Sequence, residues 1–357
     1  MLIETHGADI YSAAEKAGIK ENNIIDFSSN INPLGMPESV KVAAVNSIAY
    51  SDRYPDINSR ELIRGISKFE NVPESWIFAA NGAAEAIYRI VFCLKPKKGL
   101  VTAPAFSEYE NALNMIGAQV EYYNLREESD FKIQDDILEH INFDTDIVFI
   151  CNPNNPTGQL TDMEMTEKVI DSCRQAGSAV AVDECFLDFV KNKEEYSSVK
   201  FLGKYDNLIV LKAFTKIYAI PGIRLGYCIS SNEQIVEKLK MSGPPWNVSS
   251  IAQASGITAL KEKDYIDRTV EYIIEQRKYL IKELNRLNIK TYNSCANYIL
   301  FKIQYSLDLK DEMLKKGILI RSCSNYKNLG ENYYRIAVKT SEQNQIIIKA
   351  LKEVIGG

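Results

Sequence analysis

Lys216 and Arg224 are the residues whose type and spacing best suit catalysis, because they are two cations that follow a predicted buried strand at Leu208–Leu211. A lysine in such a loop can condense with an aldehyde when burial and neighbouring cations lower the pKa of its amine. Arg224 can bind a phosphate and at the same time disfavour protonation of Lys216. A lone loop lysine is more often simply solvated, so this interpretation depends on the second cation.

Asp183 and Asn155 extend the pattern upstream, since each follows a predicted strand. Asp183 ends the apolar run Ala179–Val182, and Asn155 lies in the Asn-Pro-rich turn after the run Asp146–Ile150. Ligands of open α/β sheets bind at the carboxyl ends of the strands, so Asp183 is a candidate counter-ion, and the turn that contains Asn155 lies at a sheet edge as well. The alternatives are an ordinary strand-ending acid and a plain rigid turn.

The segment Asn81–Glu85 lies where a predicted strand passes into a helix. Gly82 permits a close approach there, and the free N–H groups at the start of the helix, together with the helix dipole, attract phosphate. This signal is weak by itself. The sequence contains no G-x-G-x-x-G motif and no Walker lysine loop, so neither a dinucleotide site nor an ATP site is indicated.

The elements that must position these groups follow an α/β pattern. Between residues 77 and 230, short apolar runs alternate with helical segments, which is typical of a sheet flanked by helices. A long helical stripe follows from residue 249, then strands predicted at Asn297–Lys302, Ile318–Arg321 and Tyr334–Val338 and a helix at Ser341–Val354. We therefore expect an N-terminal arm (residues 1–35) that packs on the small domain or the active site, a large domain (36–245) and a small C-terminal domain (246–357).

The composition is that of an ordinary globular protein. The 357 residues are 46% hydrophobic and 25% charged, with 42 Lys and Arg against 47 Asp and Glu and a net charge of -5. This charge argues against nucleic acid and anionic membranes as partners. The opening segment lacks the basic start and apolar run of a signal peptide, and no apolar stretch approaches the roughly 20 residues of a membrane span. The seven dispersed cysteines and two histidines show no disulfide or metal-ligand spacing, so we expect a cytoplasmic protein without a metal site.

Taken in order, these segments resemble the fold type I pyridoxal-phosphate enzymes of the class I/II aminotransferase family across most of the chain. The resemblance implies a large α/β domain with a mostly parallel sheet, a smaller C-terminal α/β domain, pyridoxal 5'-phosphate as cofactor and a homodimer. It places the cofactor phosphate on the backbone of Ala83 and Ala84 and on Arg224, the ring against Phe106, the ring hydroxyl on Asn155 and the ring nitrogen on Asp183. It further assigns the covalent link to Lys216 beside Thr215, a contact to the neighbouring subunit's cofactor phosphate to Tyr54, and the substrate carboxylate to Arg335.

Two groups of that family handle phosphorylated amines, the threonine-phosphate decarboxylases and the histidinol-phosphate aminotransferases. The sequence resembles the first in its opening His6-Gly7-Ala8, in the segment Asp26–Gly35 and in Phe186, which stands where aminotransferases usually have a tyrosine that bonds the cofactor hydroxyl. The resemblance therefore implies decarboxylation of L-threonine O-3-phosphate to (R)-1-aminopropan-2-ol O-phosphate in cobalamin biosynthesis. For the substrate phosphate it implies His6, Asn32 and Arg321.

Two alternatives remain open. Transamination of histidinol phosphate with 2-oxoglutarate, in histidine biosynthesis, differs in which substrate bond is aligned with the ring π system, and the sequence does not show that angle. A non-catalytic pyridoxal-phosphate-binding module is the other alternative, against which the intact Lys216, Asp183 and Asn155 argue. The chain also departs from the family pattern, since Ala213 stands where many relatives have Ser or Thr near the phosphate and Ala8 replaces a glycine.

Overall fold

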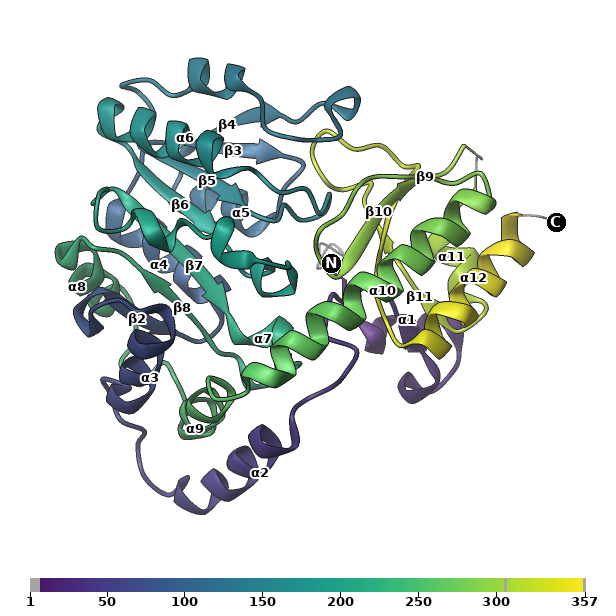
Figure 1. Cartoon of the computed structure of the whole chain (residues 1–357), viewed down its shortest axis with the longest axis horizontal. Coiled ribbons are helices and arrows are strands. Elements are labelled where there is room, and N and C mark those ends of the chain that lie inside the picture. The colour runs from purple at the N-terminus through teal and green to yellow at the C-terminus, as the bar shows by residue number, and fades with distance from the viewer. Residues whose placement is uncertain (1–6, 305–306, 356–357) are drawn as a thin grey trace.

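A seven-stranded sheet forms the larger part of the molecule in the computed structural model, which describes residues 7–304 and 307–355 (Figure 1). The strand order is β2-β8-β7-β6-β5-β3-β4. Only β8 runs antiparallel to its neighbours in this sheet, and the remaining pairs are parallel. The strands are β2 (Ile77–Ala80), β3 (Lys98–Ala103), β4 (Gln119–Asn124), β5 (Ile147–Cys151), β6 (Ala179–Asp183), β7 (Leu208–Ala213) and β8 (Gly226–Ile229).

Helices cover both faces of this sheet, which explains why its central strands are apolar along their whole length. In β5, Ile147 and Phe149 face a core shared with α4 (Ala83–Leu94), α5 (Glu108–Met115) and α8 (Glu233–Met241). Val148 and Ile150 face the opposite core, shared with α3 (Arg60–Glu70) and α6 (Met163–Ala176). This arrangement confirms the predicted α/β fold with a mostly parallel sheet.

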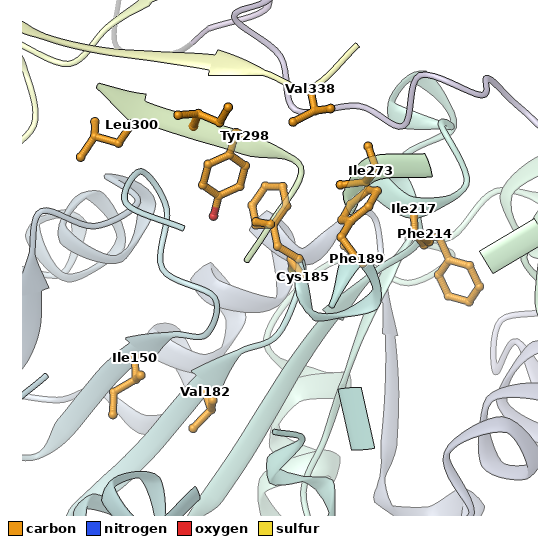
Figure 2. Packing of buried hydrophobic residues seen from close by; sticks show 14 of the residues in the cluster. Ile150, Val182, Cys185, Phe189, Phe214, Ile217, Ile273, Tyr298, Leu300 and Val338 are labelled. Atoms are coloured by element: carbon orange, nitrogen blue, oxygen red, sulfur yellow. The ribbon is translucent and has the colours of Figure 1, made fainter. Parts of the chain in front are cut away.

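A smaller antiparallel sheet lies beside the large one, in the order β12-β13-β10-β9. Figure 2 shows Tyr298 pointing from this sheet toward the strands that carry Ile150 and Val182, with Cys185 and Phe189 nearby. These residues belong to one continuous core, so the two sheets are packed into a single body. The remaining elements of this part are β9 (Lys290–Thr291), β10 (Tyr298–Lys302), α11 (Leu309–Leu314), β12 (Arg321–Ser322), β13 (Tyr333–Ala337) and α12 (Ser341–Ile355).

The described part of the N-terminal arm, residues 7–35, packs on the small sheet's side of the molecule. Its helix α1 (Ile10–Ala17) contributes Ala13 to a cluster with Leu314 and Leu319, and its strand β1 (Ile25–Asp26) pairs in parallel with β11 (Ile318–Leu319). The strand-like piece predicted at Ile318–Arg321 is present, but as two short strands, β11 and β12 (Arg321–Ser322). The chain changes partner at Ile320, so that β11 pairs with the arm and β12 pairs with β13.

Two helices bear on where the domains divide. The helix α9 (Ser250–Ala259) follows residue 245 in the chain, yet it packs against α3 and α2 (Glu38–Ser47) on the side of the large sheet. The helix α10 (Lys263–Arg286) then runs across to the small sheet (Figure 1). Ile266, Ile273 and Leu280 of α10 are buried along this path. We propose that the division lies within α10 rather than at residue 245, because α9 buries its apolar surface against the large part.

The strand registers bring the ends of five strands to one edge of the large sheet. Gly226, the first residue of the antiparallel β8, lies opposite both Ala80 of β2 and Ala213 of β7. Cys151 at the end of β5 lies opposite Asp183 at the end of β6. The loops that leave this edge carry the residues singled out by the sequence. No helix in the described ranges is both long enough and apolar enough to cross a membrane.

Candidate active site

A cavity of about 400 Å³ opens at this edge of the large sheet. Its volume lies within the usual range for small-molecule sites, roughly 300–1,000 Å³. Residues of the arm and of the small sheet complete its wall. The predicted site residues that line it are Ala83, Ala84, Phe106, Asn155, Asp183, Thr215, Lys216, Arg224 and Arg335.

One end of the cavity is built to bind an anion. The helix α4 begins there without a side-chain cap, because Gly82 occupies its N-cap position. Gly82 has a φ of 81°, and a Cβ at this position would lie 2.5 Å from Nη2 of Arg224. A Cβ on Gly226 would lie 2.5 Å from the backbone nitrogen of Ala83. The two glycines thus allow Arg224 and the positive end of the helix to meet, which makes a cradle for a phosphate.

Asp183 is fixed at the base of the cavity. Its Oδ2 accepts a hydrogen bond of 2.6 Å from the hydroxyl of Tyr109, and its Oδ1 accepts one of 2.9 Å from the backbone N–H of Cys185. Burial and the Asp183 carboxylate raise the pKa of Tyr109 well above its usual value, so Tyr109 remains a donor. A carboxylate held in this way can keep a proton on a ring nitrogen placed beside it.

Two lysines four residues apart have opposite electrostatic surroundings. Burial, with Arg335 and Arg224 adding to it, lowers the pKa of Lys216 to about 8. Burial alone would lower the pKa of Lys212 as well, but the ion pairs of its Nζ with Glu70 (3.4 Å) and Glu184 (3.2 Å) raise that pKa above its usual value. Lys216 is therefore the amine that can act as a nucleophile or base near neutral pH.

Arg335 lies opposite the large sheet, on β13. It donates from Nη1 to Oδ1 of Asn155 and from Nη2 to the carbonyl oxygen of Ser28, the second bond measuring 2.7 Å. Its Nε is buried and has no partner among the described residues. The guanidinium lies 5.5 Å from the ring centroid of Tyr298. Such a fixed guanidinium suits the binding of a carboxylate.

Phe186 also lines the cavity and brings no hydroxyl to it. Its ring meets that of Tyr298 edge to face, at 5.0 Å between centroids. The Tyr298 hydroxyl donates to the carbonyl oxygen of Asn154 at 2.8 Å, so this hydroxyl is already used. Ala213 lines the cavity too, and it likewise offers no hydroxyl to a phosphate.

The structure corrects the prediction for Asn32. Its amide donates to the carbonyl oxygen of Ile217 (2.7 Å) and to Thr269 (2.8 Å), and it does not line the cavity. Asn32 holds the loop behind Lys216 instead. Asn30, two residues earlier, lines the cavity, and its Oδ1 is buried without a partner among the described residues. Sequence reasoning missed Asn30, although it stands in the same polar segment.

Two further predicted residues, Arg321 and Tyr54, lie outside the main cavity. Arg321 lines a small adjoining cavity that shares Phe106 and Tyr326 with it. Tyr54 is 80% exposed and packs on Trp246, with 4.6 Å between ring centroids. His6 lies outside the described residues, which begin at Gly7 on the cavity wall.

Comparison with known proteins decides the family. The sequence matches the aminotransferase class I and II family over residues 22–351. The chain belongs to this family.

It is 36% identical to a threonine-phosphate decarboxylase of Salmonella typhimurium, covering 99% of this chain and 97% of that protein. It is 32% identical to an adenosylcobalamin biosynthesis bifunctional protein of Leptospira interrogans, covering all of this chain and 42% of that longer protein. The crystal structure of the histidinol-phosphate aminotransferase from Clostridium acetobutylicum superposes with a TM-score of 0.87 at 33% identity, covering 92% of this chain and 98% of that one.

Enzymes of this family depend on pyridoxal 5'-phosphate, and the residues of the cavity fit this group. The cradle between Gly82 and Arg224, which a Cβ would fill, suits its phosphate. Asp183 suits the ring nitrogen, and Lys216 offers the low-pKa amine that an aldehyde needs. Phe106 and Asn155, which line the same cavity, are available for the ring face and the ring hydroxyl.

The cradle yields a first prediction. Gly82→Ala places a methyl group against the Arg224 guanidinium, so we expect the affinity for pyridoxal phosphate to fall at least tenfold with little change in affinity for phosphate-free pyridoxal. Absorbance titration of the apo-protein with each compound measures both affinities. Gly203→Ala is the matched control, because a Cβ there meets no atom within 4 Å. An equal loss of affinity for pyridoxal phosphate and for pyridoxal would contradict the role of the cradle.

Lys216 yields a second prediction. The rate at which the apo-protein combines with pyridoxal should rise with pH about a midpoint near 8, because only the neutral amine attacks an aldehyde. Arg224→Gln should move this midpoint upward, since it removes a neighbouring positive charge. Stopped-flow absorbance across pH 6 to 11 measures the profile, and a midpoint near 10.5 in the wild type would refute this account of Lys216.

The lowered pKa of Lys216 also makes the folding stability depend on pH. Between pH 8 and 10.5 the unfolded chain binds more protons at Lys216 than the folded protein does, so folding stability at this position rises with pH across that window. Lys216→Met should lack this rise in denaturant unfolding curves.

Proposed function

We propose that this protein is a pyridoxal-phosphate-dependent decarboxylase that converts L-threonine O-3-phosphate to (R)-1-aminopropan-2-ol O-phosphate in cobalamin biosynthesis. The observation that carries the proposal is Phe186, which lines the cavity where aminotransferases usually place a tyrosine hydroxyl. The similarity to the decarboxylase of Salmonella typhimurium over nearly the whole chain supports it. The similarity to an adenosylcobalamin biosynthesis protein supports the pathway.

Several residues of the cavity each have a distinct role in this reaction. Pyridoxal phosphate, when bound, supplies an electrophilic ring that accepts the electron pair left at Cα when CO2 departs. Asp183 keeps the proton on the ring nitrogen, and Arg224 holds the phosphate so that the ring stays in place. Lys216, whose pKa is about 8, can deliver the proton that replaces the lost carboxylate at Cα.

Arg335 determines which bond of the substrate breaks in this scheme. The bond that is cleaved is the one aligned with the ring π system. Arg335 is held between Asn155 and the Ser28 carbonyl, so a carboxylate bound to it is held in a fixed direction. We propose that Arg335 would hold the substrate carboxylate in the orientation that decarboxylation needs, while the cofactor would supply the electron-accepting ring. Asn30 and Arg321 are the groups we propose for the substrate phosphate, with His6 as a further candidate beyond the described residues.

The alternative function is transamination of histidinol phosphate. The fold similarity to the histidinol-phosphate aminotransferase from Clostridium acetobutylicum favours it, since both chains are covered almost fully. The two reactions differ in their need for an oxo acid, so a single assay separates them.

We also propose a homodimer in the cytoplasm. Apolar side chains at Val45 (58% exposed), Ile48 (58%) and Tyr50 (60%) lie open on and after α2, close in sequence to Tyr54. A second copy of this chain would cover them and receive Tyr54 at its cofactor phosphate. All seven cysteines are free thiols, which fits a reducing compartment.

The decarboxylase proposal yields a third prediction. Holo-protein incubated with L-threonine phosphate, without any oxo acid, should release CO2 and aminopropanol phosphate in equal amounts over many turnovers. Phe186→Tyr should raise the ratio of transamination to decarboxylation by up to about tenfold, because the new hydroxyl can donate a hydrogen bond worth roughly 1.5 kcal/mol to the ring oxygen. Isotope-labelled CO2 release and product chromatography measure both reactions. Absence of CO2, with histidinol phosphate and 2-oxoglutarate yielding glutamate, would make the protein the aminotransferase.

The dimer proposal yields a fourth prediction. Tyr54→Ala and Lys216→Ala should each be nearly inactive at limiting cofactor. Their co-expression should restore about a quarter of the wild-type activity, because half of the dimers are hybrids with one intact site. Hybrids without activity would mean that Tyr54 serves its own subunit, and a fully active Tyr54→Ala protein would mean that it serves neither.

A further inference from the structure

The carboxylate of Glu127 joins the two sheets at a point outside the cavity. Glu127 opens the 3-10 helix Glu127–Ser129, which follows β4 of the large sheet. Its Oε1 accepts hydrogen bonds of 2.6 Å from both Lys290 and Tyr292, and its Oε2 accepts bonds from Lys302 (3.0 Å) and Tyr333 (2.6 Å). We call these five residues the clasp. All four donors lie on or beside the strands of the small sheet.

Neighbouring contacts reinforce the clasp. The ring of Phe131 lies edge-on to the rings of Tyr292 and Tyr333, at 5.0 and 6.2 Å between centroids. Burial alone would raise the pKa of Glu127, but the hydrogen bonds from the four donors lower it far below its usual value. The carboxylate is therefore charged throughout the neutral range, and the clasp stays closed.

The clasp acts on the strand that carries Arg335. Tyr333 and Arg335 are two residues apart on β13, so their side chains lie on the same face of the small sheet. Lys302, another donor of the clasp, is the register partner of Tyr333. Arg335 in turn has Leu300 and Arg321 as register partners. The clasp thus fixes β10 and β13 at a point about two residues, roughly 7 Å along the strand, from Arg335.

Carboxylate binding at Arg335 is sensitive to this fixation. Lys216 lies in α7 (Phe214–Ile217), directly after β7 of the large sheet, and Arg335 lies on the small sheet, so the distance between them depends on how the sheets are held together. A displacement of about 1 Å in a reacting group can cost a large factor in rate. Among the residues that the structure describes, Arg335 bonds Asn155, Ser28 and, at 3.4 Å, the hydroxyl of Tyr326.

We infer that Glu127 is a positioning residue, which sets Arg335 at the distance from Lys216 that the substrate carboxylate requires. This inference rests on the proposed function in assigning the carboxylate to Arg335. If so, the clasp should affect the binding of ligands that carry a carboxylate at Cα and leave the binding of ligands that lack it unchanged.

The test compares two ligands of the holo-protein that differ by this carboxylate. Glu127→Gln keeps the size of the side chain but removes the charge that holds Lys290 and Lys302. We expect binding of L-threonine phosphate to weaken at least tenfold, with binding of aminopropanol phosphate unchanged within twofold, both measured by cofactor absorbance. Tyr333→Phe, which keeps the ring contact with Phe131, should give the same selectivity with a smaller effect. Glu128→Gln is the matched control, since the exposed Glu128 takes no part in the clasp.

The outcomes separate the inference from the function on which it rests. Equal weakening of both ligands, or no weakening of either, in the Glu127→Gln and Tyr333→Phe proteins would overturn the inference. Failure of the wild type to decarboxylate L-threonine phosphate would overturn the proposed function alone. In that case the two ligands to compare are L-glutamate, which carries a carboxylate at Cα, and histidinol phosphate, which does not. Glu127→Gln should then weaken the binding of L-glutamate and leave the binding of histidinol phosphate unchanged.

Discussion

Lys216, Arg224 and Arg335 bring three positive charges to one cavity, and the uncapped end of α4 adds a partial positive charge. Burial lowers the pKa of Lys216, and the charges of Arg335 and Arg224 lower it further, to about 8. The same field attracts anions, which in this family are a cofactor phosphate and an acidic substrate. The two arginines therefore contribute both to the reactivity of the lysine and to the affinity for anionic ligands.

Much of the surrounding structure serves to hold these charges in place. Arg224 approaches the helix because Gly82 has no Cβ. The turn that carries Lys216 is tied to the arm through Asn32, whose backbone N–H donates to the Lys216 carbonyl oxygen at 3.2 Å. Arg335 is held on β13, which the carboxylate of Glu127 fastens to the large sheet. A charge cluster of this kind needs restraint from several elements because each cation gains by moving away from the others.

The sequence predicts the fold and the centre of the site well, because both depend on local patterns. Asp183 and Lys216 each follow an apolar run that ends at the same edge of a parallel sheet, and the spacing along the chain is enough to infer this. Which of Asn30 and Asn32 faces the cavity depends instead on contacts with the distant α7 (Phe214–Ile217) and α10, which no local pattern contains. The clasp at Glu127 escaped prediction for the same reason, since its donors lie more than 160 positions further along the chain.

The central claim is that the cavity binds an anionic aldehyde covalently at Lys216 and at no other lysine. Borohydride reduction of the holo-protein, followed by proteolysis and mass spectrometry, tests it directly. The account predicts a single pyridoxyl group on the peptide that contains Lys216, with Lys212 in the same peptide region unmodified because its ion pairs keep it protonated. A pyridoxyl group on Lys212 or on another lysine, or none at all, would contradict it.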